Sequence, residues 1–182
     1  MTEYQSKRVL RERVLTINAP AAKIFHLLCP QKETEWLDGW NYKMIFSATG
    51  LAENDAIFST KHDGDVNTIW VVSRYDKRNK LIEFVRLTWE TVITKIIYKV
   101  KDNHDGTSSV FVQYIFTSVT EKGDEYVHDS GEKQFEHMTR WIEKSMNYYL
   151  QSGRKLLMLN SRKPKKKEVV PVKKMKRKIR KG

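Results

Sequence analysis

The stretch from Tyr42 to Thr120 constrains the fold of this chain most, because it alternates between β-prone segments and short turns. Runs rich in β-branched and aromatic residues, bounded by Asn, Asp, Gly and Lys, are typical of strands joined by hairpins. Six strands are predicted, over 42–48, 56–61, 67–75, 80–89, 91–101 and 108–119. The predicted turns fall at Ala52–Asp55, His62–Asp65, Asp76–Asn79 and Asp102–Thr107. Since such connections are too short for a crossover helix, the strands are expected to form an antiparallel meander.

A long amphipathic helix is predicted over 130–159, after a loop at 120–129. Its apolar residues recur at spacings of three and four, which places them on one helical face. The stripe consists of Phe135, Met138, Ile142, Met146, Tyr149, Gly153 and Leu156, widened by Trp141, Tyr148, Leu150 and Leu157. At a rise of ~1.5 Å per residue the helix would be about 45 Å long, enough to cross the face of a wide sheet.

Residues 8–17 are predicted to form one further strand ahead of the meander, followed by two short helices. Asn18 is a favourable cap for a helix at about 20–28, and Pro20 falls in its first turn, where proline is tolerated. A second helical turn is predicted at 31–37. The fold class is therefore α+β, with a bent antiparallel sheet of six to seven strands wrapped around the long C-terminal helix. Because one helix cannot fill so wide a hollow, a cavity between sheet and helix is expected.

The net charge of +12 lies almost entirely at the end of the chain. Residues 162–182 hold twelve Lys or Arg and one acid, Glu168, a net charge of +11 that leaves +1 for the rest. The predicted organisation is a folded domain over 1–160 and a disordered basic tail over 161–182. Four interpretations of the tail stay open: contacts with nucleic-acid phosphates, adsorption to an anionic membrane at roughly 1 kcal/mol per basic residue, a solubilising extension, or, in a eukaryote, the nuclear import signal that KPKKK at 163–167 resembles.

Composition excludes some classes of protein and leaves others without support. With 40% hydrophobic and 11% aromatic residues, the chain can build a core. No apolar run approaches the roughly 18–20 residues of a membrane span, and no secretory signal is recognisable. The single cysteine, Cys29, is expected to be a buried structural thiol, which fits a cytoplasmic location. Hydrolase, P-loop and dinucleotide motifs are missing and the histidines lack metal-ligand spacing, so neither a cofactor nor a metal is predicted.

Several segments resemble a known superfamily. Residues 17–25 (INAPAAKIF) place Ala-Pro-Ala-x-x-Ile-Phe at a strand-to-helix junction, and Cys-Pro at 29–30 leads to EWLDGW at 35–40. WVVSRYD at 70–76 is followed by IEFVR at 82–86. Together with the order of elements, these segments resemble the helix-grip superfamily (SRPBCC), which includes START lipid-transfer domains, Bet v 1-type allergens and polyketide cyclases. The resemblance covers about residues 5–160 and implies a helix-grip fold that binds sterols, lipids or polyketides, or acts on them.

The aromatic residues are the strongest indication of a ligand, because indole and phenol groups combine a large apolar area with one polar group. Trp89 and Trp141 also lie on elements that border the expected cavity. The alternative is that the aromatic residues are ordinary core residues of a small domain. The predicted ligand-binding residues are Trp36, Trp40, Tyr42, Trp70, Arg74, Phe84, Arg86, Tyr114, Phe116, Phe135, Met138 and Ile142.

Arg74 and Arg86 are the charges of greatest interest. Strand alternation places Arg74 on the face of Trp70 and Arg86 on the face of Phe84. An arginine on an inward face needs a carboxylate partner or an anionic ligand. Solvent-facing or structural ion-pair roles are the alternative. The candidate carboxylate partners are Glu35, Asp38 and Glu83.

Three functions follow from these observations. The first is a protein that binds a hydrophobic or amphipathic small molecule, such as a lipid, sterol or polyketide, with an arginine orienting its head group. The second is a cyclase or dehydratase that uses the same cavity, for which the candidate acids and bases are Glu35, Asp38, Glu83 and Tyr114. The third is an interaction protein that contacts nucleic acid or an anionic membrane through residues 162–182.

Overall fold

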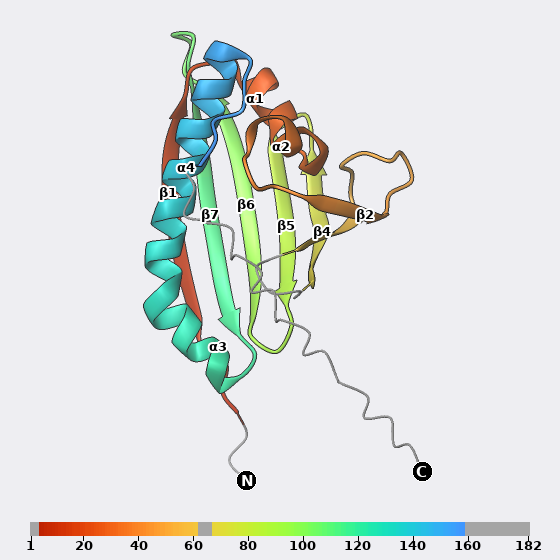
Figure 1. The fold of residues 1–182 in the computed structure, drawn as a ribbon, viewed down its shortest axis with the longest axis vertical. Coiled ribbons are helices and arrows are strands. Elements are labelled where there is room, and N and C mark those ends of the chain that lie inside the picture. The colour runs from red at the N-terminus through yellow and green to blue at the C-terminus, as the bar shows by residue number, and fades with distance from the viewer. Residues whose placement is uncertain (1–3, 62–66, 159–182) are drawn as a thin grey trace, which may run out of the picture.

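The helices and strands follow the predicted order (Figure 1). The computed structural model describes residues 4–61 and 67–158, so the predicted tail at 161–182 and the predicted turn at His62–Asp65 lie outside the described residues. The elements are β1 (Arg8–Ile17), α1 (Ala21–Leu27), α2 (Pro30–Trp36), β2 (Tyr42–Phe46), β3 (Ile57–Lys61), β4 (Asn67–Asp76), β5 (Leu81–Thr88), β6 (Val92–Asp102), β7 (Ser108–Ser118), α3 (Glu121–Glu125), the π-helical turn η1 (Tyr126–Ser130) and α4 (Gly131–Ser152).

Seven strands form one antiparallel sheet in the order β1-β7-β6-β5-β4-β3-β2. The six strands of the meander pair with their neighbours in sequence, and β1 joins the free edge of β7. Burial alternates without interruption along β7, so that every second side chain faces the interior. The predicted antiparallel meander and the predicted sheet size are confirmed.

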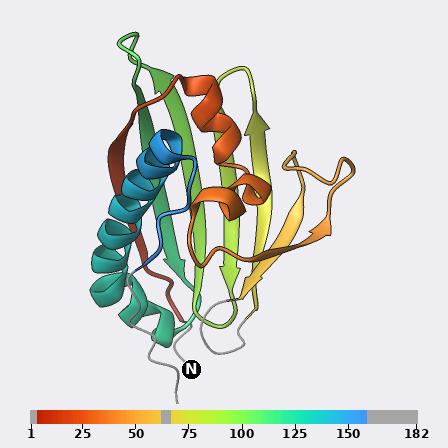
Figure 2. The same cartoon turned by 45° about the horizontal axis from the view of Figure 1, so that its top comes forward.

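The helix α4 lies along the β1 edge of the concave face and leaves the middle strands uncovered (Figures 1 and 2). Its side chains fix it there. Glu143 accepts a hydrogen bond from the Thr16 amide at 2.8 Å, and Asn147 bonds the backbone of both Thr16 and Asn18. These contacts also cover backbone groups of an edge strand that would otherwise be free to pair with another chain. The helices α1 and α2 cover one end of the same face (Figure 2).

The C-terminal helix is shorter than predicted. It ends at Ser152 because Gly153 adopts a φ of +67°, the left-handed conformation in which helices commonly terminate. The Gly153 amide donates a hydrogen bond to the Tyr149 carbonyl at 2.8 Å. The twenty-two residues of α4 span about 33 Å. The apolar spacing that suggested a longer helix continues to Leu156, which lies beyond the helix end.

The predicted loop at 120–129 is helical instead. Thr120 caps α3 by accepting a hydrogen bond from the Gly123 amide. A Cβ at Gly123 would lie 2.0 Å from the Thr91 carbonyl oxygen, so only glycine allows α3 to approach the β5–β6 hairpin this closely. A helix of five residues was missed because it has no apolar repeat of its own.

Candidate ligand-binding cavity

A cavity of about 340 Å³ lies between the concave face of the sheet, α2 and α4. This volume is at the lower end of the roughly 300–1,000 Å³ typical of small-molecule sites. The predicted ligand-binding residues that line it are Trp40, Trp70, Phe84, Arg86, Tyr114, Met138 and Ile142. A neighbouring cavity of about 400 Å³ shares Arg86, Tyr114 and Met138 with the first and adds the predicted residues Phe116 and Phe135.

Two of the predicted aromatic residues, Trp36 and Tyr42, line neither cavity. Trp36 is fully buried, and its indole N–H donates to the Leu27 carbonyl at 2.8 Å, so it joins α2 to α1 as a core residue. Tyr42 packs edge-on against Phe58, with ring centroids 6.1 Å apart. For these two residues the structure supports the alternative of ordinary packing.

Arg74 also lies outside both cavities, because a β-bulge changes the facing of β4. The register with β5 shifts between Val72 and Arg74, and an extra residue reverses the alternation that follows it. Tyr75 therefore takes the inward position and stacks on Phe25, with ring centroids 5.3 Å apart. The Arg74 guanidinium is exposed and pairs with Asp76 at 3.0 Å.

Four aromatic residues, which we call the aromatic wall, form one side of the cavity: Trp40, Phe58, Trp70 and Phe84. Phe58 and Trp70 stack at 5.5 Å, and Phe84 meets both rings edge-on at 6.1 and 6.0 Å. Trp40 meets Trp70 edge-on at 5.8 Å. The Trp70 indole N–H donates to the Thr60 hydroxyl at 2.9 Å. Stacked and edge-on pairs of this kind are favourable beyond their buried area, so the wall is a rigid surface.

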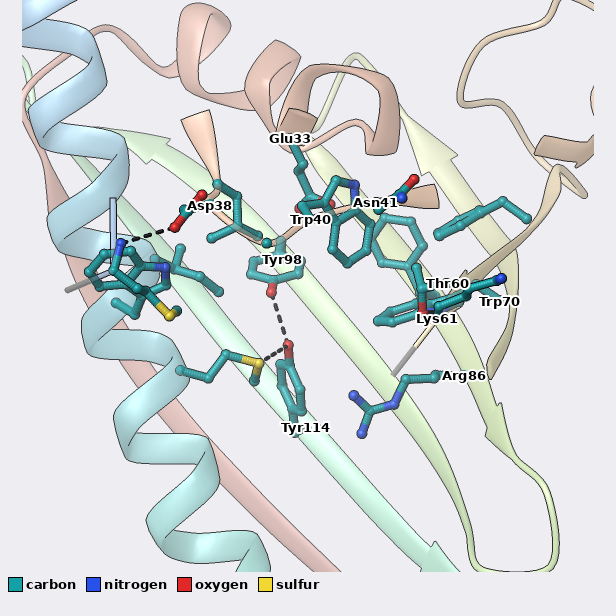
Figure 3. A pocket seen from close by; sticks show the side chains of 18 residues that line it. Glu33, Asp38, Trp40, Asn41, Thr60, Lys61, Trp70, Arg86, Tyr98 and Tyr114 are labelled. Carbon is teal, nitrogen blue, oxygen red and sulfur yellow. Dashed lines mark hydrogen bonds between the residues drawn. The ribbon is translucent and has the colours of Figure 1, made fainter. Parts of the chain in front are cut away.

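Arg86 reaches the cavity from β5 and is 8% exposed. Its Nη2 donates to the Thr94 hydroxyl at 3.2 Å, and its Cζ lies 5.4 Å from the centre of the Trp70 ring. Within the described residues, its buried Nε has no hydrogen-bond partner. Figure 3 shows the guanidinium pointing from β5 toward Tyr114. The predicted inward position of Arg86 is therefore where the structure places it.

Two tyrosines form a polar centre on the floor of the cavity (Figure 3). The hydroxyls of Tyr98 and Tyr114 lie 3.0 Å apart, and the Tyr114 hydroxyl also donates to the Met138 sulfur at 3.7 Å. Burial raises the pKa of Tyr98 well above its ordinary value and that of Tyr114 to about 12. Both phenols are therefore neutral hydrogen-bonding groups at physiological pH.

Glu33, which the sequence analysis did not single out, lines the cavity from α2. Its side chain is buried, and burial raises the pKa of its carboxyl group to about 8. A signal for it exists in the sequence, because the three-residue spacing of Pro30, Glu33 and Trp36 puts all three on the buried face of α2. Tyr98 was also not predicted as a cavity residue, although the alternation of β6 places its side chain inward.

Two of the three predicted acids do not reach the cavity. Glu35 is exposed and binds Lys32 at 2.6 Å and the Tyr149 hydroxyl at 2.8 Å. Glu83 lies on the outer face of the sheet, where it pairs with Lys95 at 3.0 Å. The expectation that one of these acids pairs with an arginine of the cavity is wrong. Asp38 does line the cavity, but it accepts a backbone hydrogen bond instead.

Residues 154–158, which we call the C-terminal strap, follow the turn at Gly153 and fold back onto the cavity. The Met158 amide donates to the Asp38 carboxylate at 3.0 Å, and Met158 lines the cavity. Trp141 of α4 also lines it, with a buried Nε1 that has no partner in the part of the chain that the structure describes. Met158 thus borders the cavity beside α4.

The remaining expectations concern Cys29, metals and membranes. Cys29 is a buried free thiol whose sulfur lies 3.4 Å from the Tyr75 hydroxyl, and burial raises its pKa, as expected of a structural cysteine. Within residues 4–61 and 67–158, no three His, Cys, Asp or Glu side chains cluster so as to hold a metal ion. The helices within these ranges are too short or too polar to cross a bilayer.

A bent seven-stranded sheet with two short helices after its first strand and a C-terminal helix packed on its concave face defines the Bet v 1-like helix-grip fold. Solved structures agree. Ara h 8.0201 superposes with a TM-score of 0.61 at 14% identity, over 80% of this chain and 99% of its own. A norcoclaurine synthase variant from Thalictrum flavum gives a TM-score of 0.62 at 11% identity, over 83% and 99%.

The Zhui aromatase/cyclase from a Streptomyces species gives a TM-score of 0.59 at 9% identity, over 82% of this chain and all of its own. No protein-family model matches the sequence. No curated protein matches it either. At such low identity these structures establish the fold alone, and the function has to be argued from the cavity.

Proposed function

We propose that this protein binds a hydrophobic or amphipathic small molecule in the cavity between the sheet and α4. The proposal rests on the aromatic wall, a preformed apolar surface that borders a cavity of about 340 Å³. Burial of the ligand against this wall supplies the binding free energy, about 2.5 kcal/mol for each ~100 Å² of apolar ligand surface removed from water. The polar groups of Arg86, Tyr98 and Tyr114 then fix the orientation of the ligand.

Neighbours in fold support a ligand of this kind. Norcoclaurine synthase has been solved in complex with dopamine and hydroxybenzaldehyde, two small aromatic molecules. The name of the Zhui aromatase/cyclase states that this protein aromatises and cyclises its own substrate. We propose that this chain likewise binds a small molecule, of a size that its own cavity accommodates.

A second candidate function is catalysis of the cyclase or dehydratase type, with Glu33 as the acid. A carboxyl group whose pKa lies near 8 is protonated at neutral pH and sits in the range suited to general acid–base chemistry. Glu33 lines the same cavity as the Tyr98–Tyr114 pair, which can orient a substrate oxygen. Turnover that is lost in Glu33→Gln, with ligand affinity retained, would favour this function over binding alone.

A third proposal concerns residues 162–182, whose net charge of +11 suits contact with nucleic acid or an anionic membrane. This role is separate from the cavity. Removal of the segment would abolish either association and leave the folded domain and its ligand unchanged.

Native mass spectrometry of the purified protein tests these proposals together, with the intact chain compared with a chain that ends at Asn160. We expect an adduct of a small molecule on both forms, released by mild activation, whose mass gives its chemical class. Nucleic acid retained on the intact chain alone would assign the principal function to the basic segment. Bare protein on both forms, combined with no response to hydrophobic probes in solution, would contradict ligand binding.

A further inference from the structure

Arg86 is a buried charge without a counter-ion in the described part of the chain. Its interactions there are one hydrogen bond to the neutral Thr94 hydroxyl and a stacking contact with Trp70. No ion pair reaches it from the side chains that the structure describes, those of residues 4–61, 68–128 and 131–158. A buried guanidinium that lacks a carboxylate is costly, and folded proteins normally pair such a group.

The acids of the same cavity do not neutralise Arg86. Glu33 forms no ion pair with it, and the pKa of Glu33 is raised by burial alone, which leaves that carboxyl group uncharged at neutral pH. Asp38 accepts the amide of Met158 at 3.0 Å. The Tyr98 and Tyr114 hydroxyls are neutral and satisfy each other. The cavity therefore has a positive interior at Arg86 and no ionised acceptor beside it.

Two buried side-chain donors of residues that line the cavity have no partner in the described part of the chain. The buried Nε of Arg86 and the buried Nε1 of Trp141 both lack partners in the described chain. Both groups can only donate hydrogen bonds. A ligand that satisfies these two donors must supply acceptor oxygens. An acceptor oxygen that faces Arg86 binds more strongly if it carries a negative charge.

We infer that the ligand is an anionic amphiphile, a hydrophobic carboxylate whose charged group pairs with Arg86 while its apolar body lies against the aromatic wall. This inference rests on the proposed binding function and adds the chemical class of the ligand. Arg86 borders both the cavity of about 340 Å³ and its neighbour of about 400 Å³, so the carboxylate lies where the two meet. The modest volume favours one chain or one ring system over a lipid with two acyl chains.

The test uses matched probes on the full-length protein. Decanoate and 1-decanol share one alkyl chain, and 1-naphthaleneacetate and 1-naphthaleneethanol share one ring system. Affinities are measured near neutral pH by isothermal titration calorimetry and by the fluorescence change of the cavity tryptophans. We expect at least one carboxylate to bind more tightly than its alcohol, by on the order of 10- to 100-fold, as for a charge-assisted hydrogen bond.

Variants assign the preference to Arg86. In Arg86→Met the carboxylate and the alcohol should bind equally, with the affinity for the alcohol retained. Arg86→Lys keeps the positive charge and should keep part of the preference for the carboxylate. This variant also tests the inference if Arg86→Met folds poorly. Arg74→Met is the matched control, because Arg74 is a solvent-exposed arginine of the neighbouring strand and its loss should change nothing.

The outcomes separate this inference from the proposed function. Equal binding of carboxylate and alcohol to the wild-type protein would overturn the anionic class and leave a hydrophobic binding site. A preference that survives in Arg86→Met would also overturn it. If none of the four probes bound to the wild-type protein, the proposed binding function would fail as well.

Discussion

The two sides of the cavity are built differently. The sheet side comes from β3 to β7, where a regular register places Phe84, Tyr98 and Tyr114 on one face. The helical side comes from α2, α4 and the C-terminal strap, which are joined by single contacts such as Met158 to Asp38. The sheet side is one continuous packed surface that exists without a ligand. The segments of the helical side pack on the core separately and are linked to one another by polar contacts such as those of Met158 with Asp38 and of Tyr149 with Glu35. We therefore expect the sheet side to govern stability and affinity, and the helical side to govern access.

The largest effect is expected on the sheet side, from Trp70→Ala. Trp70 touches three other aromatic rings and donates to Thr60, so its loss leaves a hole in the aromatic wall. We expect a loss of about 3–5 kcal/mol in the free energy of unfolding, measured by urea titration and circular dichroism. Trp89→Ala is the control, since Trp89 is 77% exposed and its removal should cost within about 0.5 kcal/mol. Equal costs for the two variants would mean that the wall is not packed.

The next largest effect is expected on the helical side, where Glu33 makes the free energy of unfolding depend on pH. Burial raises the pKa of its carboxyl group from 4.5 to about 8. Between those values the folded chain holds a proton that the unfolded chain has lost, so stability falls as pH rises, by up to about 1.4 kcal/mol per pH unit. Glu33→Gln should remove this slope, so that the variant matches the wild type near pH 4 and exceeds it in stability at pH 8.

Glu35→Gln is the control for this prediction, because Glu35 lies on the same helix but is exposed. Lys32 and Tyr149 lower the pKa of Glu35, so its contribution has the opposite sign and is lost as pH falls. Urea titrations at a series of pH values measure both slopes. A wild-type slope that persists in Glu33→Gln would mean that Glu33 is ionised and solvated in the folded protein.

A smaller effect is expected where the C-terminal strap meets Asp38. Asp38→Ala removes the acceptor of the Met158 amide, a hydrogen bond worth about 1 kcal/mol. Hydrogen exchange of residues 154–158, followed by mass spectrometry, should accelerate roughly fivefold as the strap detaches. Asp38→Asn keeps an acceptor oxygen and should retain most of the protection. Unchanged exchange in both variants would show that the strap is held by its side chains alone.

The difference between the two sides also explains what could be predicted from the sequence. The sheet side follows from alternation with a period of two, and this pattern placed Arg86 on the same face as Phe84, where both line the cavity. It failed at Arg74, because a bulge shifts the register and a one-residue change reverses the facing of every later side chain. Nothing in the spacing of apolar residues marks that bulge.

The helical side was predicted less well, because its contacts join residues far apart in the chain. Met158 and Asp38 are separated by 120 positions, and the apolar spacing up to Leu156 suggested a longer helix in place of a strap. Glu33 was overlooked although its spacing from Pro30 and Trp36 was available, since an acid among polar neighbours is normally assigned to the surface. The burial of Glu33 depends on where α2 packs, which the local pattern does not determine.

The last comparison removes one tyrosine hydroxyl from each side of the cavity, and both effects are expected to be about 1 kcal/mol or less. Tyr98→Phe breaks a buried hydrogen bond of 3.0 Å with Tyr114 on the sheet side and should cost about 1 kcal/mol in the free energy of unfolding. Tyr149→Phe breaks a solvent-exposed bond of 2.8 Å with Glu35 between α4 and α2, where water replaces the lost partner, and should cost a few tenths of a kcal/mol. Urea titration of both variants at one pH gives the comparison. A larger cost for Tyr149→Phe than for Tyr98→Phe would contradict the expected order. The hydrogen bond between α4 and α2 would then stabilise the fold more than the hydrogen bond inside the sheet.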